Sequence, residues 1–187
     1  MLWTNTGGPW LLLVLCHGIV AERKWDYEPK FVSTHTSDES QLKIGANIDR
    51  LNRADFAVSA TFDWNYDVDE TTMVEGHAFR SFNGDESAYK LIPLSIPSTP
   101  FGNFIDTYYK DVFLTNVGYC SNLPQFKDKF QLPWPRGHYH LTKCVFSGQG
   151  LPEVLPLGYY KIFFKITGDN QPTWGFTVIL HIKAKMF

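Results

Sequence analysis

The chain has 187 residues, a formal net charge of −2 and an aromatic content of 16%. The slightly acidic balance argues against a nucleic-acid-binding protein, because such proteins usually carry a basic excess. Many aromatic residues together with only 3 methionines favour either a β-rich core or an apolar pocket lined by aromatic rings.

The first part of the chain resembles an export signal. Residues 10–16 form an apolar run that is too short for a bilayer, which needs about 20 apolar residues. The run is followed by the small residue Ala21 and then by charged residues, as at a signal-peptide cleavage site. No Lys or Arg precedes the run, so a buried N-terminal strand or helix is the alternative. We expect a signal peptide at 1–21 and a single secreted domain at 22–187.

The cysteines agree with an extracellular location. Cys16 falls inside the expected signal, which leaves Cys120 and Cys144. A pair of cysteines in a secreted chain predicts one disulfide. Closing that loop would stabilise the fold by about 3.5 kcal/mol in the chain-entropy model. Two unpaired buried thiols are the alternative.

Alternation of apolar and polar residues, the period of a half-buried strand, recurs along the chain. It is clearest at 56–68, and in two runs at 159–166 and 173–183 that a short Gly/Asn/Pro segment joins into a predicted hairpin. Weaker patterns predict strands at 27–36, 42–51, 73–82, 88–92 and 139–147. The predicted fold is mainly β: an antiparallel β-cup or sandwich with an apolar cavity and one short helix.

The short helix is expected from residue 101. Ser98 and Thr99 are N-cap candidates, and Pro100 would occupy the first turn. Apolar residues then recur at helical spacing up to Val112. Asp106 is placed to pair with a lysine four residues later.

An irregular segment follows between Cys120 and His140. Its prolines exclude a central strand or an unbroken helix, yet it carries Phe126, Phe130 and Trp134. Aromatic residues in such a loop either pack on the core or line an open cup that holds an apolar guest. The candidate lipid-binding residues are Phe62, Trp64, Phe104, Tyr108, Phe126, Phe130, Trp134, Ile162, Phe164, Trp174 and Phe176.

Motifs for catalysis or metal binding are not evident, and we predict neither catalytic residues, nor a metal, nor a cofactor. Asp63, Asn65 and Asp67 resemble the start of a calcium loop, but the later positions lack its Gly and Glu. They are better explained as the solvent face of a strand. His138 and His140 could share a strand face as metal ligands, but no third ligand has supporting spacing.

Several segments together resemble a known family. They are CSNLPQFK at 120–127, PWPRGHYHL at 133–141, LPEVLPLGYYKI at 151–162, FNGDES at 82–87 and QPTWGF at 171–176. The pattern resembles the insect CheB family of chemosensory proteins, from about residue 25 to the C-terminus. It is also similar, more distantly, to the lysosomal ganglioside-activator protein.

This resemblance implies a secreted β-cup with a lipid-holding cavity and a role in the gustatory detection of contact pheromones. The expected partners are a lipid or long-chain hydrocarbon and a chemosensory membrane receptor or channel, without nucleic acid. The activator has several disulfides, whereas only Cys120 and Cys144 are present here, which leaves the shape of the cavity mouth open. The alternatives are a receptor-docking module without an internal ligand, and a hydrolase of unrecognised type.

Overall fold

The computed structural model describes residues 23–53 and 55–185. The expected signal peptide, including Cys16, lies outside this range. Within it the protein is mainly β, with two antiparallel sheets, as the sequence predicts.

The larger sheet has five strands in the order β1-β8-β7-β4-β5. These strands are β1 (Trp25–Thr36), β4 (Met73–Ser81), β5 (Lys90–Pro100), β7 (Gly158–Thr167) and β8 (Trp174–Ala184). The smaller sheet has the order β2-β3-β6, with β2 (Leu42–Arg50), β3 (Phe56–Trp64) and β6 (Gly137–Cys144). A short 3₁₀ turn, η1 (Glu86–Ala88), lies between β4 and β5.

The predicted C-terminal hairpin is confirmed as β7 and β8. Phe164 pairs with Phe176, and Ile166 pairs with Trp174. Because side chains alternate between faces along a strand, these four residues share one face of the larger sheet. That face points into the molecule, where Phe164, Ile166 and Trp174 are buried.

Two strand ends differ from the prediction by four residues or more. β3 ends at Trp64, although Tyr66 and Val68 beyond it are also buried. β5 runs to Pro100 and contains three prolines, well past the predicted end at Ile92. Prolines are tolerated there because β5 is an edge strand and needs no N–H donors on its free side.

One helical segment follows β5. It consists of α1 (Phe101–Phe104), the wider π-type turns of η2 (Ile105–Leu114), α2 (Thr115–Val117) and the 3₁₀ turn η3 (Gly118–Cys120). The predicted N-cap is wrong: the helix begins at Phe101 without a side-chain cap, and the Thr99 hydroxyl donates to Pro97 O instead, at 2.6 Å. The predicted pairing of Asp106 with Lys110 is present at 3.2 Å.

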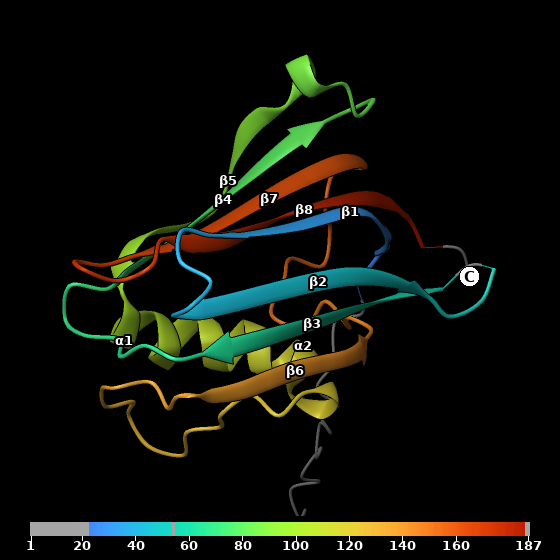
Figure 1. Cartoon of the computed structure of the whole chain (residues 1–187). Coiled ribbons are helices and arrows are strands. Elements are labelled where there is room, and N and C mark those ends of the chain that lie inside the picture. Colours follow the sequence, from blue (N-terminus) through green and yellow to red (C-terminus); the bar gives the residue numbers. More distant parts are fainter. Residues whose placement is uncertain (1–22, 54, 186–187) are drawn as a thin grey trace, which may run out of the picture.

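The two sheets and the helical segment form a cup (Figure 1). The sheets meet where β1 lies beside β2, and the Thr34 hydroxyl there donates to Ile44 O at 3.2 Å. On the opposite side α1 contacts β4 and β5, while α2 and η3 contact β6. The helical segment therefore bridges the free sides of the two sheets and closes the cup.

Candidate functional site

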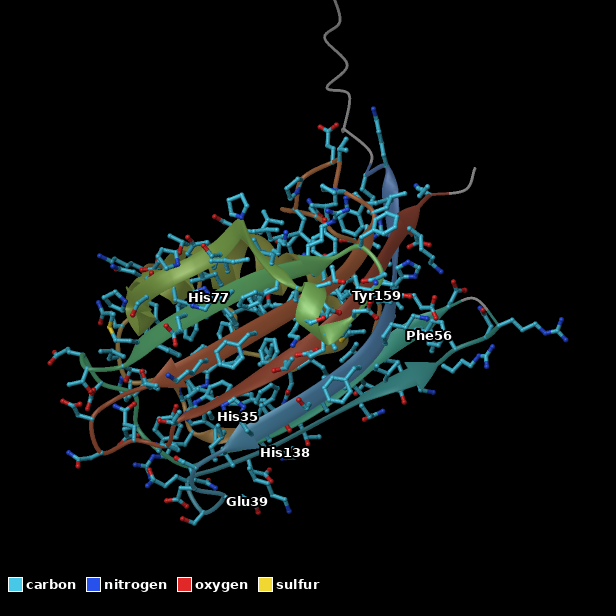
Figure 2. All side chains as sticks on the ribbon, turned by 90° about the horizontal axis from the view of Figure 1, so that it is seen from above. His35, Glu39, Phe56, His77, His138 and Tyr159 are labelled. Carbon is cyan, nitrogen blue, oxygen red and sulfur yellow. A yellow bond between two sulfur atoms is a disulfide. The ribbon has the colours of Figure 1, made fainter. Side chains whose placement is uncertain are left out.

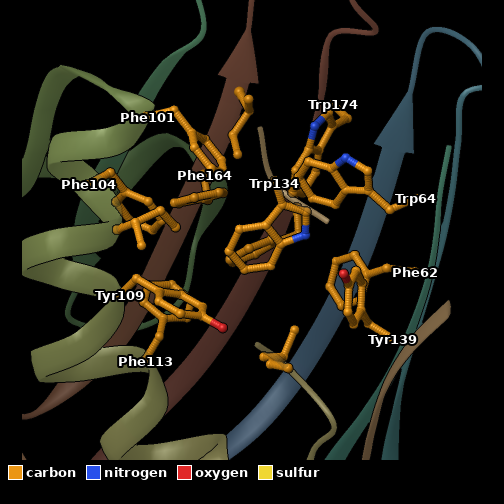
Figure 3. A pocket seen from close by; sticks show the side chains of 14 residues that line it. Phe62, Trp64, Phe101, Phe104, Tyr109, Phe113, Trp134, Tyr139, Phe164 and Trp174 are labelled. Atoms are coloured by element: carbon orange, nitrogen blue, oxygen red, sulfur yellow. The ribbon is translucent and has the colours of Figure 1, made fainter. Parts of the chain in front are cut away.

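An apolar cavity of about 90 Å³ lies at one end of the cup (Figure 3). Both sheets, the helical segment and the loop at 121–136 contribute to its wall. The lining residues are Phe62, Trp64, Phe101, Phe104, Ile105, Tyr109, Phe113, Leu123, Trp134, Tyr139, Phe164, Ile166, Trp174 and Phe176. None of them carries a charge at neutral pH, so the site is chemically suited to an apolar guest.

Seven of the predicted lipid-binding residues line this cavity. They are Phe62, Trp64, Phe104, Trp134, Phe164, Trp174 and Phe176. The structure therefore brings together residues from β3, β7, β8, the helical segment and the loop that are up to about a hundred positions apart in the chain.

The other four predicted residues lie elsewhere. Tyr108 stacks on Phe104 with ring centroids 6.3 Å apart but does not line the cavity. Phe126 and Phe130 pack against each other at 4.9 Å in the layer behind Trp134. Ile162 lies further along β7, on the same face as Phe164.

The remaining lining residues were not predicted as binding residues: Phe101, Ile105, Tyr109, Phe113, Leu123, Tyr139 and Ile166. The helical periodicity from Phe101 contained part of the signal. Because η2 has the wider i→i+5 turn, the cavity side of the helix passes from Phe104 to Tyr109 and not to Tyr108. No local pattern distinguishes Leu123.

The end of the cavity is closed by stacked aromatic rings. Trp64 stacks on Tyr66, with ring centroids 5.0 Å apart, and meets Trp174 edge-on at 5.3 Å. The Trp174 indole donates to the Tyr66 hydroxyl at 2.8 Å, and burial raises the pKa of that hydroxyl. These rings pack against one another, and most of their polar atoms are hydrogen-bonded. The residues at this end therefore belong to the hydrophobic core as well as to the cavity wall.

The loop at 121–136 covers the side of the cavity. The Tyr109 hydroxyl donates to Pro124 O at 2.7 Å, and the Tyr139 hydroxyl donates to Pro135 O. The Asp106 carboxylate accepts the Phe130 backbone N–H at 2.8 Å, and this bond keeps the pKa of Asp106 below its usual value. The loop is thus attached to the helical segment and to β6 by partly buried hydrogen bonds.

The interior continues beyond the cavity toward the middle of the cup. Ile162 and Val178 face each other in the β7–β8 pair, and Ile48 and Val58 do so in the β2–β3 pair. By strand alternation all four lie on the inner faces, yet all four are only half-buried. These four apolar side chains therefore face inward and still keep part of their surface accessible to solvent.

The predicted disulfide joins Cys120 and Cys144, whose Cα atoms are 5.5 Å apart. It connects the end of the helical segment to the end of β6. Cys144 is fully buried, beside Val58 in the pairing of β3 with β6. The disulfide therefore fixes the helix against the smaller sheet near the middle of the cup.

The acidic and histidine residues singled out in the sequence lie away from the cavity. His138 contacts Asp63 on the exposed side of the smaller sheet, and His140 is 6.4 Å from His138 between ring centroids. Asp67 forms a two-point ion pair with Arg136 at 2.7 and 2.8 Å, which lowers the pKa of Asp67. Among residues 23–53 and 55–185, no three His, Cys, Asp or Glu side chains are grouped to hold a metal ion.

Further histidines lie over the outer face of the larger sheet (Figure 2). His35 stacks with Phe163 at 6.4 Å, and His181 stacks with Tyr159 at 4.4 Å. Phe163 and Tyr159 alternate along β7 with the inward-facing Phe164 and Tyr160. These aromatic residues therefore belong to the outer surface and not to the cavity.

The sequence comparisons bear on part of this site. Residues 74–162 match the family described as "Protein of unknown function (DUF1091)". The matched segment begins in β4, ends in β7 and contains the helical segment, the disulfide and the covering loop. It thus supplies the helix and loop side of the cavity.

A comparison with curated proteins gave no match. In the part of the chain that the structure describes, no helix is both long and apolar enough to cross a membrane.

Proposed function

We propose that this protein is a secreted, non-enzymatic binder of lipids or long-chain hydrophobic pheromones. One observation carries the proposal: inward-facing apolar side chains on both sheets stay half-buried next to a partly open apolar cavity. A guest chain that lay along Ile48, Val58, Ile162 and Val178 would complete their burial. Burial of apolar surface is then the source of affinity, and no polar chemistry is required.

The cavity alone is too small to give a lipid a useful affinity. A water molecule occupies about 30 Å³ of liquid volume, so the cavity of about 90 Å³ holds roughly three groups the size of a methylene. At about 0.8 kcal/mol per buried methylene, these contribute only about 2.4 kcal/mol. A micromolar affinity corresponds to about 8.2 kcal/mol and thus needs at least about ten buried methylenes. The chain of the ligand therefore extends from the cavity along the half-buried inner walls.

The biological role follows from the resemblance to the CheB family. Contact pheromones are often waxy, long-chain compounds that need a carrier in water. We propose that the protein takes up such a ligand outside the cell and acts in its gustatory detection, together with a chemosensory membrane receptor or channel. The family matched at 74–162 has no described function, so the proposed role rests on the resemblance.

Transfer of a fluorescent lipid tests the proposal directly. Residues 22–187 would be mixed with liposomes that contain a fluorescent long-chain lipid, and the protein would be separated by gel filtration. We expect the fluorescence to co-elute with the folded protein at about one lipid per chain, and to be absent with a solidly packed protein of similar mass. Absence of transfer at every protein concentration would contradict the proposal.

The docking-module alternative has one observation in its favour. Phe82 is 83% exposed at the end of β4, and its Cα lies 3.4 Å from where a Cβ on Gly158 would stand. Leu157, just before Gly158, is 49% exposed, so the backbone segments that carry these two exposed apolar residues lie side by side on the surface. The loop aromatics offer no such surface, since Phe130 and Trp134 are 6% and 3% exposed. A Phe82→Ser variant that lost receptor binding but kept lipid transfer would assign docking to this surface.

A further inference from the structure

The outer face of the larger sheet carries apolar side chains in all five strands. One line of register partners crosses this face from β1 to β5: Phe31, Ile179, Lys161, Phe79 and Leu91. Both ends of the line are open to solvent, since Phe31 is 47% and Leu91 is 62% exposed. The solvated face of an antiparallel sheet is normally polar. Four apolar side chains in one line across it therefore indicate a surface that contacts a partner.

The middle of this face is aromatic. Phe163 lies on β7, the central strand of the five, and pairs with His77 on one side and with Thr177 on the other. The His35 ring stacks on Phe163 with ring centroids 6.4 Å apart, and both histidines lie over the sheet in Figure 2. We use the name outer patch for the side chains of Phe31, His35, His77, Phe79, Phe163 and Ile179.

The lysines and glutamates around the outer patch are paired with one another. The pairs are Lys165 with Glu75 at 3.4 Å, Lys183 with Glu28 at 3.2 Å, and Lys161 with Glu86. The face therefore presents little net charge. Such a face suits a partner surface that is itself neutral better than it suits a nucleic acid or an acidic peptide.

The edges of the sheet are poorly suited to strand addition. β5 contains three prolines, which lack an N–H and protect an edge strand from pairing with another chain. The opposite edge strand, β1, lies beside β2 within the cup. Association through this sheet therefore uses its outer face and not its edges.

The outer face is large enough for a stable dimer. The sheet has five strands, which lie about 4.8 Å apart. Its β4–β7 pair has nine residue pairs, and each residue advances the strand by about 3.4 Å. The face therefore measures about 24 by 30 Å, or roughly 700 Å². Stable interfaces bury about 800 Å² on each partner, and the side chains that project from the sheet add area to this flat value.

We propose that the protein forms a symmetric dimer through the outer patch, with a second copy of the same chain as the partner. A two-fold interface uses the same patch on both copies, so a neutral face meets a neutral face and each copy keeps its own ion pairs. An axis across the middle of the face brings the two aromatic centres together, as in the packing of two sheets in a sandwich. The cavity lies on the inner side of the sheet, so the dimer stands or falls independently of lipid binding.

A matched pair of threonine variants tests the dimer. Thr177 lies next to Phe163 on the outer face of the larger sheet, and Thr61 lies on the exposed face of the smaller sheet. The protein, expressed as the full-length chain, would be studied by sedimentation velocity at up to about 100 μM, since interfaces of this size have micromolar or tighter dissociation constants. We expect a dimer. Thr177→Lys places like charges at the centre of the interface and should weaken the dimer at least about tenfold, whereas Thr61→Lys should leave it unchanged.

A dilution experiment on the unmodified protein does not depend on the folding of either variant. Backbone ¹H–¹⁵N resonances that move between about 100 and 1 μM should belong to the strands around the outer patch and not to β2, β3 or β6. A monomer at every concentration, or a dimer that Thr177→Lys leaves intact in its folded form, would overturn the proposal. A monomer that floated with phosphatidylcholine liposomes, and lost this in Thr177→Lys, would assign the face to a lipid surface and overturn it as well.

Discussion

Ile162 and Ile166 are the same residue type on the same strand and the same face, four positions apart on β7. Ile166 lines the closed cavity end and is 2% exposed, whereas Ile162, in the middle of the cup, is only half-buried. The contrast shows that the direction in which a side chain points and the extent to which it is buried are separate properties. Alternation along a strand determines the direction, but burial depends on whether the opposite wall reaches the side chain.

The sharpest test of this contrast is a pair of truncations on β7. Ile166→Ala should lower the free energy of unfolding by about 4 kcal/mol, because it leaves a cavity in a packed region. Ile162→Ala should cost about 1 kcal/mol, because solvent already contacts the side chain. Urea denaturation of the ligand-free proteins measures both values. Equal losses would mean that the middle of the cup is packed as tightly as its end.

Removing the disulfide should loosen the middle of the cup more than its closed end. The double variant Cys120→Ser/Cys144→Ser should lose about 3.5 kcal/mol of stability, measured by thermal or urea unfolding. Amide hydrogen exchange would then show faster exchange in β6 and in the end of the helical segment than around Trp64 and Trp174. Uniform acceleration along the chain would argue that the disulfide acts only on the unfolded state.

The attachment of the loop through Asp106 gives a smaller effect and a pH dependence. Asp106→Ala should lower stability by about 1.5 kcal/mol near neutral pH, because the Phe130 N–H loses a charged acceptor. The exposed Asp111 on the same helical segment provides a matched control, and Asp111→Ala should change stability little.

The sign of the pH effect follows from the lowered pKa of Asp106. A depressed folded-state pKa stabilises the protein above the usual carboxyl value of about 3.9, and this contribution is lost as the pH falls further. The stabilities of the wild-type protein and Asp106→Ala should therefore begin to converge as the pH falls below about 4, and should meet only below the lowered folded-state pKa. A difference that persisted in acid would mean that Asp106 acts through packing and not through its charge.

Filling the middle of the cup should affect binding more than folding. Val178→Phe places a ring on the inner face, and Thr177→Phe places the same ring on the outer face of β8. We expect the inner variant to weaken lipid binding by about tenfold, roughly 1.4 kcal/mol, and the outer variant to leave it unchanged. Equal binding by both would show that no ligand occupies this part of the interior.

Much of the fold can be predicted from the sequence because it depends on local patterns of residue type. The β7–β8 hairpin, the inner faces of β3 and β8 and the disulfide all follow from alternation, turn residues and cysteine number. Seven of the predicted binding residues line the cavity because large aromatic residues on an inner face lie in the interior wherever the cavity forms.

The rest depends on three-dimensional properties that local patterns do not record. Tyr109 lines the cavity and Tyr108 does not, because η2 adopts the wider π-type turn. The periodicity of an ordinary helix does not anticipate this turn. Phe126 and Phe130 lie one layer behind Trp134, and no sequence signal separates the front of a loop from its back.

The central claim is that a hollow apolar interior holds the chain of a lipid. The most direct test is the affinity of a homologous series of uncharged alkyl compounds for residues 22–187. We predict that each added methylene tightens binding by about fourfold, equivalent to about 0.8 kcal/mol, and that the gain stops once the interior is full. An affinity that does not change with chain length would contradict the claim.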